Sequence, residues 1–175
     1  MATAGRPDST SISRVLTTLL LTEKALSDHD VQRVAHLHDP EPVRIHVVIP
    51  AHDDRNEVEE AADDIARADF ADVFRDEDAG RTEAELTTTA ERELATSTAA
   101  LRAAGVAEVD GEVTEEHPVD RVVALATQLG ADEVVVLTEP HLIADFTRRD
   151  WATRIRHALH LPVLHVVLGT DQVVS

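Results

Sequence analysis

Short runs of apolar residues alternate with amphipathic stretches along most of this chain. The apolar runs are rich in Val, Ile and Leu, which favours buried strands. The expected strands cover residues 12–21, 43–49, 106–113, 133–137 and 163–168. Between them, apolar residues recur at three- and four-residue spacing, which predicts helices. The expected helices cover residues 28–38, 56–74, 82–104, 118–129 and 148–161. Run 12–21 also fits a buried helix, and we assign a strand because the remaining pattern requires a buried first strand.

Local signals mark several of these boundaries. Thr82 followed by Glu85 has the spacing of a capping box, which predicts a helix start. Pro118 suits the first turn of a helix, where its missing N–H costs nothing. Gly105 and Gly130 follow two helical stretches and predict their ends.

Strands that alternate with helices predict an α/β fold. We expect a five-stranded parallel, doubly wound, Rossmann-like sheet in three layers, α/β/α. Residues 1–11 are polar and predict a flexible N-terminus, and residues 12–170 form one domain. Within it, residues 52–81 are an acidic helical insertion, which is either a lid over a cleft or a solvating surface. We favour the cover, because long insertions at strand ends often gate sites.

Composition narrows the functional classes. The 175 residues carry a net charge of −18, which disfavours nucleic acids and anionic membranes as partners. Residues 53–85 hold fourteen acids against four arginines. Cysteine is absent, which excludes disulfides and thiolate chemistry. The longest apolar runs are too short to cross a bilayer, and we expect a cytoplasmic protein without membrane contact.

Two segments of the C-terminal half resemble universal stress proteins. GEVTEEHPVDRVVALATQLGADEVVVL is similar to the third strand, third helix and fourth strand of that family, and LPVLHVV is similar to its last strand. The resemblance implies the strand order 3-2-1-4-5. It also implies a homodimer in which the last strands, here Val163 to Leu168, pair antiparallel across a two-fold axis. An apolar edge strand at 163–168 would fit that pairing, since bare edges are usually paired or covered.

The chain departs from the family where ATP-binding members hold their ligand. Those members place an Asp after the first strand, where this chain has Thr22 and Glu23. They also carry a Gly-x-x-Gly loop after the fourth strand, where this chain reads TEPHLIADFTRRDW. Glycine lets main-chain N–H groups approach a phosphate, whereas Pro140 and His141 would crowd it and Glu139 would repel it. We therefore expect no cofactor, and ATP or another nucleotide is disfavoured.

Ligands of open parallel sheets bind beyond the C-terminal ends of the strands. The candidate cleft residues there are Glu23, His52, Thr138, Glu139, His141, Arg148 and Arg149. Arg148 and Arg149 either hold an anion or pair with neighbouring acids, and the acidity of the chain favours pairing. His141 beside Glu139 is either a proton-transfer pair or an exposed loop histidine, and we favour the second. We assign no catalytic residue.

The ten histidines raise the question of a metal site. Only His36 with His38 and His157 with His160 are close in sequence, and neither pair has an evident third ligand. We therefore predict surface histidines and no metal.

Three further positions fit the core of the fold better than a site. His46 and His165 lie within strands and are expected to be hydrogen-bonded core or interface groups. Trp151 is expected to cover the sheet or a cleft wall rather than to stack on a ligand.

These observations favour a non-catalytic, homodimeric, universal-stress-like binding or regulatory protein. One alternative is a small-molecule or nucleotide binder with a rebuilt cleft, in which Arg148, Arg149 and His141 replace the glycine loop and weak hydrolase activity is an extension. Another is a structural protein that binds partners through its acidic face.

Overall fold

The computed structural model describes residues 14–51, 82–139 and 151–174. The strands are β1 (Leu16–Thr22), β2 (Val43–Pro50), β3 (Glu108–Thr114), β4 (Glu133–Thr138), β5 (Val163–Val167) and β6 (Val173–Val174). The helices are α1 (Asp28–Ala35), α3 (Glu83–Ala103), α4 (Pro118–Leu129) and α5 (Trp151–Ala158).

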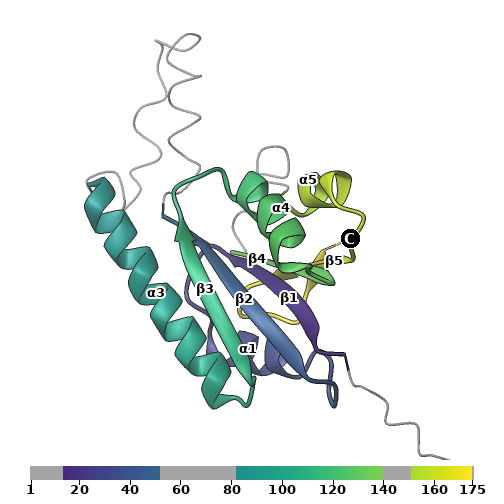
Figure 1. The fold of residues 1–175 in the computed structure, drawn as a ribbon. Helices are drawn as coiled ribbons and strands as arrows, with labels where there is room; N and C mark the ends of the chain where they lie inside the picture. Colours follow the sequence, from purple (N-terminus) through teal and green to yellow (C-terminus); the bar gives the residue numbers. More distant parts are fainter. Residues whose placement is uncertain (1–13, 52–81, 140–150, 175) are drawn as a thin grey trace, which may run out of the picture.

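The strands form one sheet in the order β3-β2-β1-β4-β5-β6 (Figure 1). β1 to β5 pair in parallel and β6 pairs antiparallel to β5. Helices α1 and α3 cover one face of the sheet, and α4 and α5 cover the other. The predicted doubly wound α/β fold and the order 3-2-1-4-5 are confirmed.

The core consists of two apolar clusters separated by the sheet. Side chains alternate across a strand, so Leu20 packs toward α1 and α3 while Leu19 and Leu21 pack toward α4 and α5. All three are fully buried. A strand covered on both faces reads as a continuous apolar run, which explains why residues 16–21 resembled a buried helix in the sequence.

Helix ends form as the local signals predicted. The carboxylate of Glu85 accepts a hydrogen bond from the main-chain N–H of Thr82 at 2.8 Å. Pro118 occupies the first turn of α4, and Gly130 ends that helix with a left-handed φ of 63°. Gly105, which follows α3, has a φ of 101°. These positions are the ones where proline and glycine are least costly.

Several predicted boundaries need correction. β1 begins at Leu16 rather than at residue 12, because its pairing with β2 starts where Leu16 meets Val43. α1 ends at Ala35 rather than at 38, and the chain then turns through a bond from the N–H of Leu37 to the carbonyl of Val34. α5 ends at Ala158 rather than at 161.

The prediction that residues 163–168 form the sheet edge is wrong. β6 lies outside β5, pairing His165 with Val174 and Val166 with Val173. A two-residue strand leaves no periodicity in the sequence, so pattern analysis could not find it.

Some predictions lie outside the described residues. These are the flexible N-terminus 1–11, the acidic insertion 52–81 with its helix 56–74, and the start of the last helix at 148–150. Among the residues that are described, no helix is both long and apolar enough to span a membrane.

Candidate functional site

The strand order reverses between the C-terminal ends of β1 and β4, and we call this place the switch point. The chain leaves β1 for β2 on one side, whereas β4 pairs with β1 on the other. Open α/β sheets bind ligands at such a switch point. Thr22 and Thr138 end the two strands and are buried.

A hydrogen bond between two acidic residues joins the loops that follow β1 and β4. The Glu23 carboxylate accepts a hydrogen bond from the main-chain N–H of Glu139 at 2.9 Å. The ammonium group of Lys24 lies 2.9 Å from the Glu139 carboxylate. A main-chain N–H just after a strand is a group that could face an anion. Here that N–H is bound to a carboxylate of the protein itself.

The loop that carries Glu23 is held by two further bonds. The Thr22 hydroxyl donates to the carbonyl of Lys24 at 2.8 Å. The N–H of Leu26 donates to the hydroxyl of Ser97 at 3.0 Å, and Ser97 is a fully buried residue of α3. These contacts fix the path of the loop and therefore the position of the Glu23 carboxylate.

Thr138 is also part of the framework. Its hydroxyl lies 2.9 Å from Nε2 of His165, on the neighbouring strand β5. Its carbonyl accepts a hydrogen bond from the N–H of Leu168 at 2.9 Å. The prediction that His165 is hydrogen-bonded is confirmed, and Thr138 joins β4 to β5.

Of the seven candidate cleft residues, the structure places Glu23, Thr138 and Glu139. Glu23 and Glu139 are in contact, and Thr138 precedes Glu139 in the chain. His52, His141, Arg148 and Arg149 lie outside the described residues. Their roles as anion or proton-transfer groups stay predictions.

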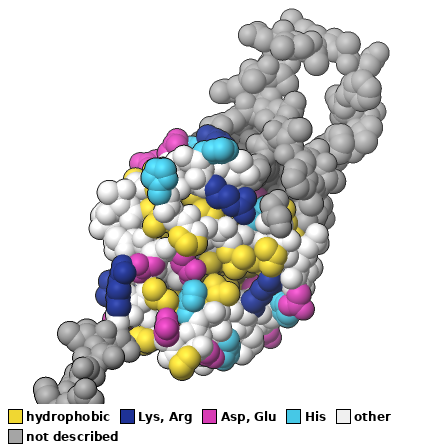
Figure 2. All heavy atoms as spheres, turned by 90° about the vertical axis from the view of Figure 1, so that its right-hand side faces the viewer, with side chains coloured by type: hydrophobic (Ala, Val, Ile, Leu, Met, Phe, Trp, Pro, Cys, Tyr) yellow, Lys and Arg dark blue, Asp and Glu magenta, His cyan; other side chains and the backbone are white. Residues whose placement is uncertain are grey.

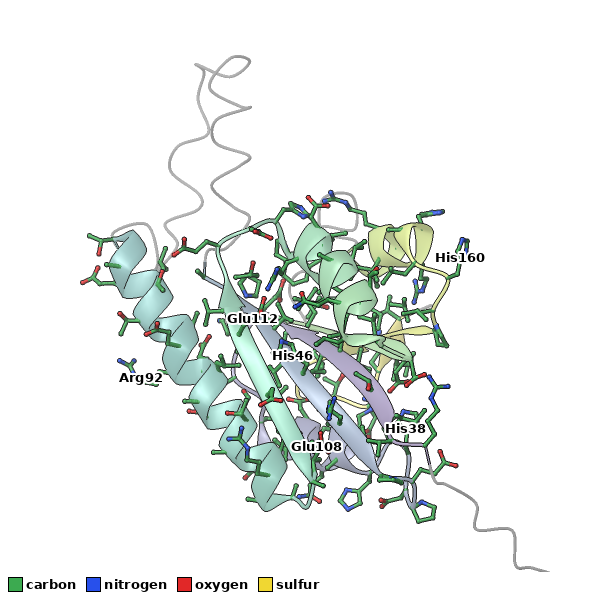
Figure 3. All side chains as sticks on the ribbon, in the orientation of Figure 1. His38, His46, Arg92, Glu108, Glu112 and His160 are labelled. Carbon is green, nitrogen blue, oxygen red and sulfur yellow. The ribbon has the colours of Figure 1, made fainter. Side chains whose placement is uncertain are left out.

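A polar cluster on the α4 face of the sheet was not found from the sequence. His46 of β2 and Glu112 of β3 lie near each other under α4 (Figure 3). The distance from His46 Nε2 to Glu112 Oε2 is 3.8 Å, which is too long for a hydrogen bond. His46 Nε2 is buried and has no hydrogen-bond partner among the described residues. The predicted hydrogen bond of His46 is therefore not found at Nε2.

Burial and neighbouring charges shift the pKa values of Glu112 and His46. Arg121 of α4 holds both carboxylate oxygens of Glu112, one of them at 2.9 Å. This bond lowers the pKa of Glu112 below its ordinary value. Burial lowers the pKa of His46, and the carboxylates of Glu112 and Asp110 offset part of that effect. Sequence analysis did not find this cluster, because the register of two parallel strands decides which of their side chains meet.

A shallow hollow of about 530 Å³ adjoins this cluster at the C-terminal end of β3. Its lining residues are Thr87, Glu91, Glu112, Val113, Thr114, Glu115, Glu116 and Arg121. The guanidinium of Arg121 is engaged by Glu112. The lining therefore carries an excess of negative charge, which opposes phosphate binding.

His36 and His38 have other partners than a metal ion. Nδ1 of His36 lies 2.7 Å from the carbonyl of Gln32, and Nε2 of His38 lies 2.6 Å from the Glu133 carboxylate. Figure 3 places His38 and His160 far apart on the molecule. Within residues 14–51, 82–139 and 151–174, no group of three His, Asp or Glu could hold a metal ion.

Trp151 packs inside the fold. It is 3% exposed and belongs to the apolar cluster between the sheet and helices α4 and α5. The prediction that it covers the sheet is confirmed.

Known proteins resemble this chain in structure, whereas comparisons of sequence find no match. No protein-family model matches the chain, and no curated protein matches it. Among solved structures, the universal stress protein from Archaeoglobus fulgidus has a TM-score of 0.54 and 16% identity over 89% of this chain and 95% of its own. A universal stress protein from Archaeoglobus fulgidus in complex with dAMP has a TM-score of 0.53 and 17% identity, covering 90% of this chain and 100% of its own.

A universal stress protein in complex with cAMP is similar to the same degree. Its TM-score is 0.54, with 15% identity over 89% of this chain and 100% of its own. Identities this low establish a shared fold alone. This chain has the Rossmann-like fold of the universal stress proteins, as its sequence resemblance predicted.

Proposed function

We propose that this chain is a divergent universal-stress-like protein that acts as a non-catalytic, homodimeric binding or regulatory module. We further propose that it does not bind ATP through the loop after β4. The observation that carries the proposal is the bond from the N–H of Glu139 to the Glu23 carboxylate. It places negative charge where a phosphate would need a donor, and a phosphate would have to displace it.

The surrounding residues support this assignment. Lys24, which follows Glu23 in the chain, is already paired with Glu139. The hollow near β3 has an acidic lining in which Arg121 is bound to Glu112. The Thr138 hydroxyl is hydrogen-bonded to His165.

Ligand-induced stabilisation tests the proposal directly. The wild-type chain is heated with ATP, ADP, AMP or cAMP at millimolar concentration. A ligand at a hundred times its Kd would stabilise the fold by about 2.7 kcal/mol. We expect no shift with ATP. An ATP-induced rise in Tm, reproduced as binding heat by calorimetry, would refute this part of the proposal.

Glu23→Ala extends this test to the blocking contact. It frees the N–H of Glu139 and removes one negative charge. Glu41→Ala removes an exposed carboxylate just before β2, at the opposite end of the strands, and serves as the control. If Glu23 prevents a phosphate from reaching this N–H, nucleotide should raise the Tm of Glu23→Ala but not that of the control.

A second candidate function is nucleotide or small-molecule binding in a rebuilt cleft. It is favoured by the similar universal stress protein structures that are complexes with dAMP and cAMP. In this hypothesis Arg148 and Arg149 supply the cationic groups. A shift with AMP or cAMP that is lost when both arginines are replaced by alanine would favour it over the first.

The proposed homodimer is supported by the apolar residues on the side of the molecule that carries β5. Half-buried apolar residues gather there, among them Leu161, Val163 and Leu164, and β6 covers only part of the β5 edge. Figure 2 shows hydrophobic side chains in a band across this side. Sedimentation velocity over a range of concentrations tests it, and a one-chain mass throughout would refute it. The cytoplasmic location stays a prediction.

A further inference from the structure

The residues after β5 fold back over the edge of that strand. The chain turns at Gly169, whose φ is 69°, and the N–H of Thr170 donates to the carbonyl of Val167 at 3.2 Å. The N–H of Val167 then donates to the carbonyl of Gln172 at 3.1 Å. β6 follows and pairs two of its residues with β5. A two-residue ladder is too short to be stable by itself.

Side chains of α1 hold this turn in place. Asp30 is 1% exposed, and its Oδ1 accepts a hydrogen bond from the N–H of Gly169 at 2.9 Å. Its Oδ2 accepts from the N–H and the hydroxyl of Ser27, at 3.1 and 2.6 Å. One buried carboxylate therefore joins the start of α1 to the turn between β5 and β6.

Arg33 and His29 add contacts to the same turn. Arg33 donates to the carbonyl of Thr170 at 2.7 Å and to that of Asp171 at 3.3 Å. Nε2 of His29 lies 3.0 Å from the Asp171 carboxylate. We call these contacts, with the Asp30–Gly169 bond, the α1 clasp. We therefore infer that the α1 clasp contributes more to keeping β6 beside β5 than the two paired residues do.

The covered edge has a defined chemical character. It accepts an antiparallel strand of two valines, Val173 and Val174. Val173 is 48% exposed although it is a large apolar residue. β5 itself reads VLHVV, so a second copy of β5 has the same character as the strand now seated on the edge. An antiparallel pair of identical strands is also compatible with two-fold symmetry.

We propose that residues 169–174 are an intrachain guard that occupies the place where β5 of a second copy would pair. The α1 clasp sets the strength of the guard. The guard limits association while it is seated, and its release exposes the full edge of β5. This inference rests on the proposed homodimer, since it describes how the edge used by that dimer is controlled.

Val174→Pro tests the guard in the full chain. Proline cannot donate a ladder hydrogen bond, so β6 should leave its seat while β5 and α1 stay unchanged. Val174→Thr keeps the N–H and the β-branched shape and is the matched control. Sedimentation velocity gives the dimer Kd, and hydrogen exchange reports protection of residues 163–167. We expect Val174→Pro to lower the Kd by about tenfold or more, equivalent to about 1.4 kcal/mol, and the control to leave it unchanged.

Asp30→Asn tests the clasp without a change in β6. It weakens the bond to Gly169 and also disturbs the cap at Ser27. Ser27→Ala weakens the same cap but spares the Gly169 bond, and is therefore its control. We expect tighter association with Asp30→Asn alone. Equal effects of the two variants would refute the clasp.

The outcomes separate the guard from the homodimer. If the wild type is a monomer and Val174→Pro dimerises, the guard is supported while the proposed wild-type homodimer fails. If the wild type is a dimer that Val174→Pro leaves unchanged, the guard fails and the homodimer stands. If Val174→Pro weakens the dimer, β6 belongs to the interface and the guard is refuted. Circular dichroism of each variant excludes unfolding as the cause.

Discussion

The carboxylate of Glu23, just after β1, binds the main-chain N–H of Glu139, just after β4, at 2.9 Å. The two residues are 116 positions apart in the sequence. Their contact joins the two loops at the point where the strand order reverses. The chain thus fills with its own acid a position that in this type of sheet serves ligands.

Removal of the Glu23 carboxylate should destabilise the fold. Glu23→Ala leaves a main-chain donor without its charged acceptor, and hydrogen bonds of this kind contribute about 1–3 kcal/mol. Urea unfolding should show a loss in this range. Glu115→Ala, at an exposed site, should stay within about 0.5 kcal/mol of the wild type. Equal stability of Glu23→Ala and the wild type would show that the bond does not form in solution.

Acidification should destabilise the protein through His46. Burial lowers its folded pKa below the ordinary 6.5, so the unfolded chain binds the proton more readily. The contribution of His46 to stability is complete above about pH 6.5 and is lost as the pH falls through the folded pKa. Glu112 and Asp110 limit the effect and Arg121 adds to it.

The pH dependence of unfolding in His46→Gln measures this contribution. The slope of unfolding free energy between pH 7 and 5 should become flatter than in the wild type. His157→Gln, at an exposed histidine, should keep the wild-type slope. An unchanged slope in His46→Gln would contradict the assignment. Glu112 acts in the same direction at lower pH, because its folded pKa is also lowered.

Gly111→Ala should be costly because β3 lies close to α3. A Cβ atom at this position would lie 2.6 Å from the Val47 carbonyl oxygen and 2.7 Å from Cδ1 of Leu94. Overpacking of this kind costs about 1–3 kcal/mol. Asp110→Ala, at the preceding exposed residue, should cost less by urea unfolding. Adding Leu94→Ala should remove the crowding by the side chain but not that by the carbonyl, so it cannot restore wild-type stability.

Trp151 should report the docking of α5. It is the only tryptophan in the chain and is 3% exposed in an apolar cluster. Its fluorescence should shift to longer wavelength on unfolding, as the indole enters water. Trp151→Ala should cost about 3–5 kcal/mol. A wild-type emission maximum typical of exposed indole would show that α5 is not docked.

Much of the fold was predictable from residues that are neighbours in sequence. The Thr82–Glu85 box and Gly130 act through local backbone geometry, and both helix ends appear as expected. The β6 strand escaped prediction because its two valines form a strand only by pairing with His165 and Val166.

The candidate site was less predictable than the fold. Glu23, Thr138 and Glu139 were assigned to one edge because parallel strands end together. Their partners were not evident, since Thr138 binds His165 and Glu139 is bound by Glu23.

The sequence by itself determined that strands β1 to β5 exist, where α3 begins and α4 ends, and the order in which these elements follow one another, because periodicity and capping act over a few residues. Only the tertiary structure decided that the Glu23 carboxylate meets the N–H of Glu139, that Nε2 of His46 lies 3.8 Å from the Glu112 carboxylate, and that Asp30 holds the turn at Gly169. Each of these depends on strand register and loop path. Burial of the whole core selects both, and no local segment encodes them.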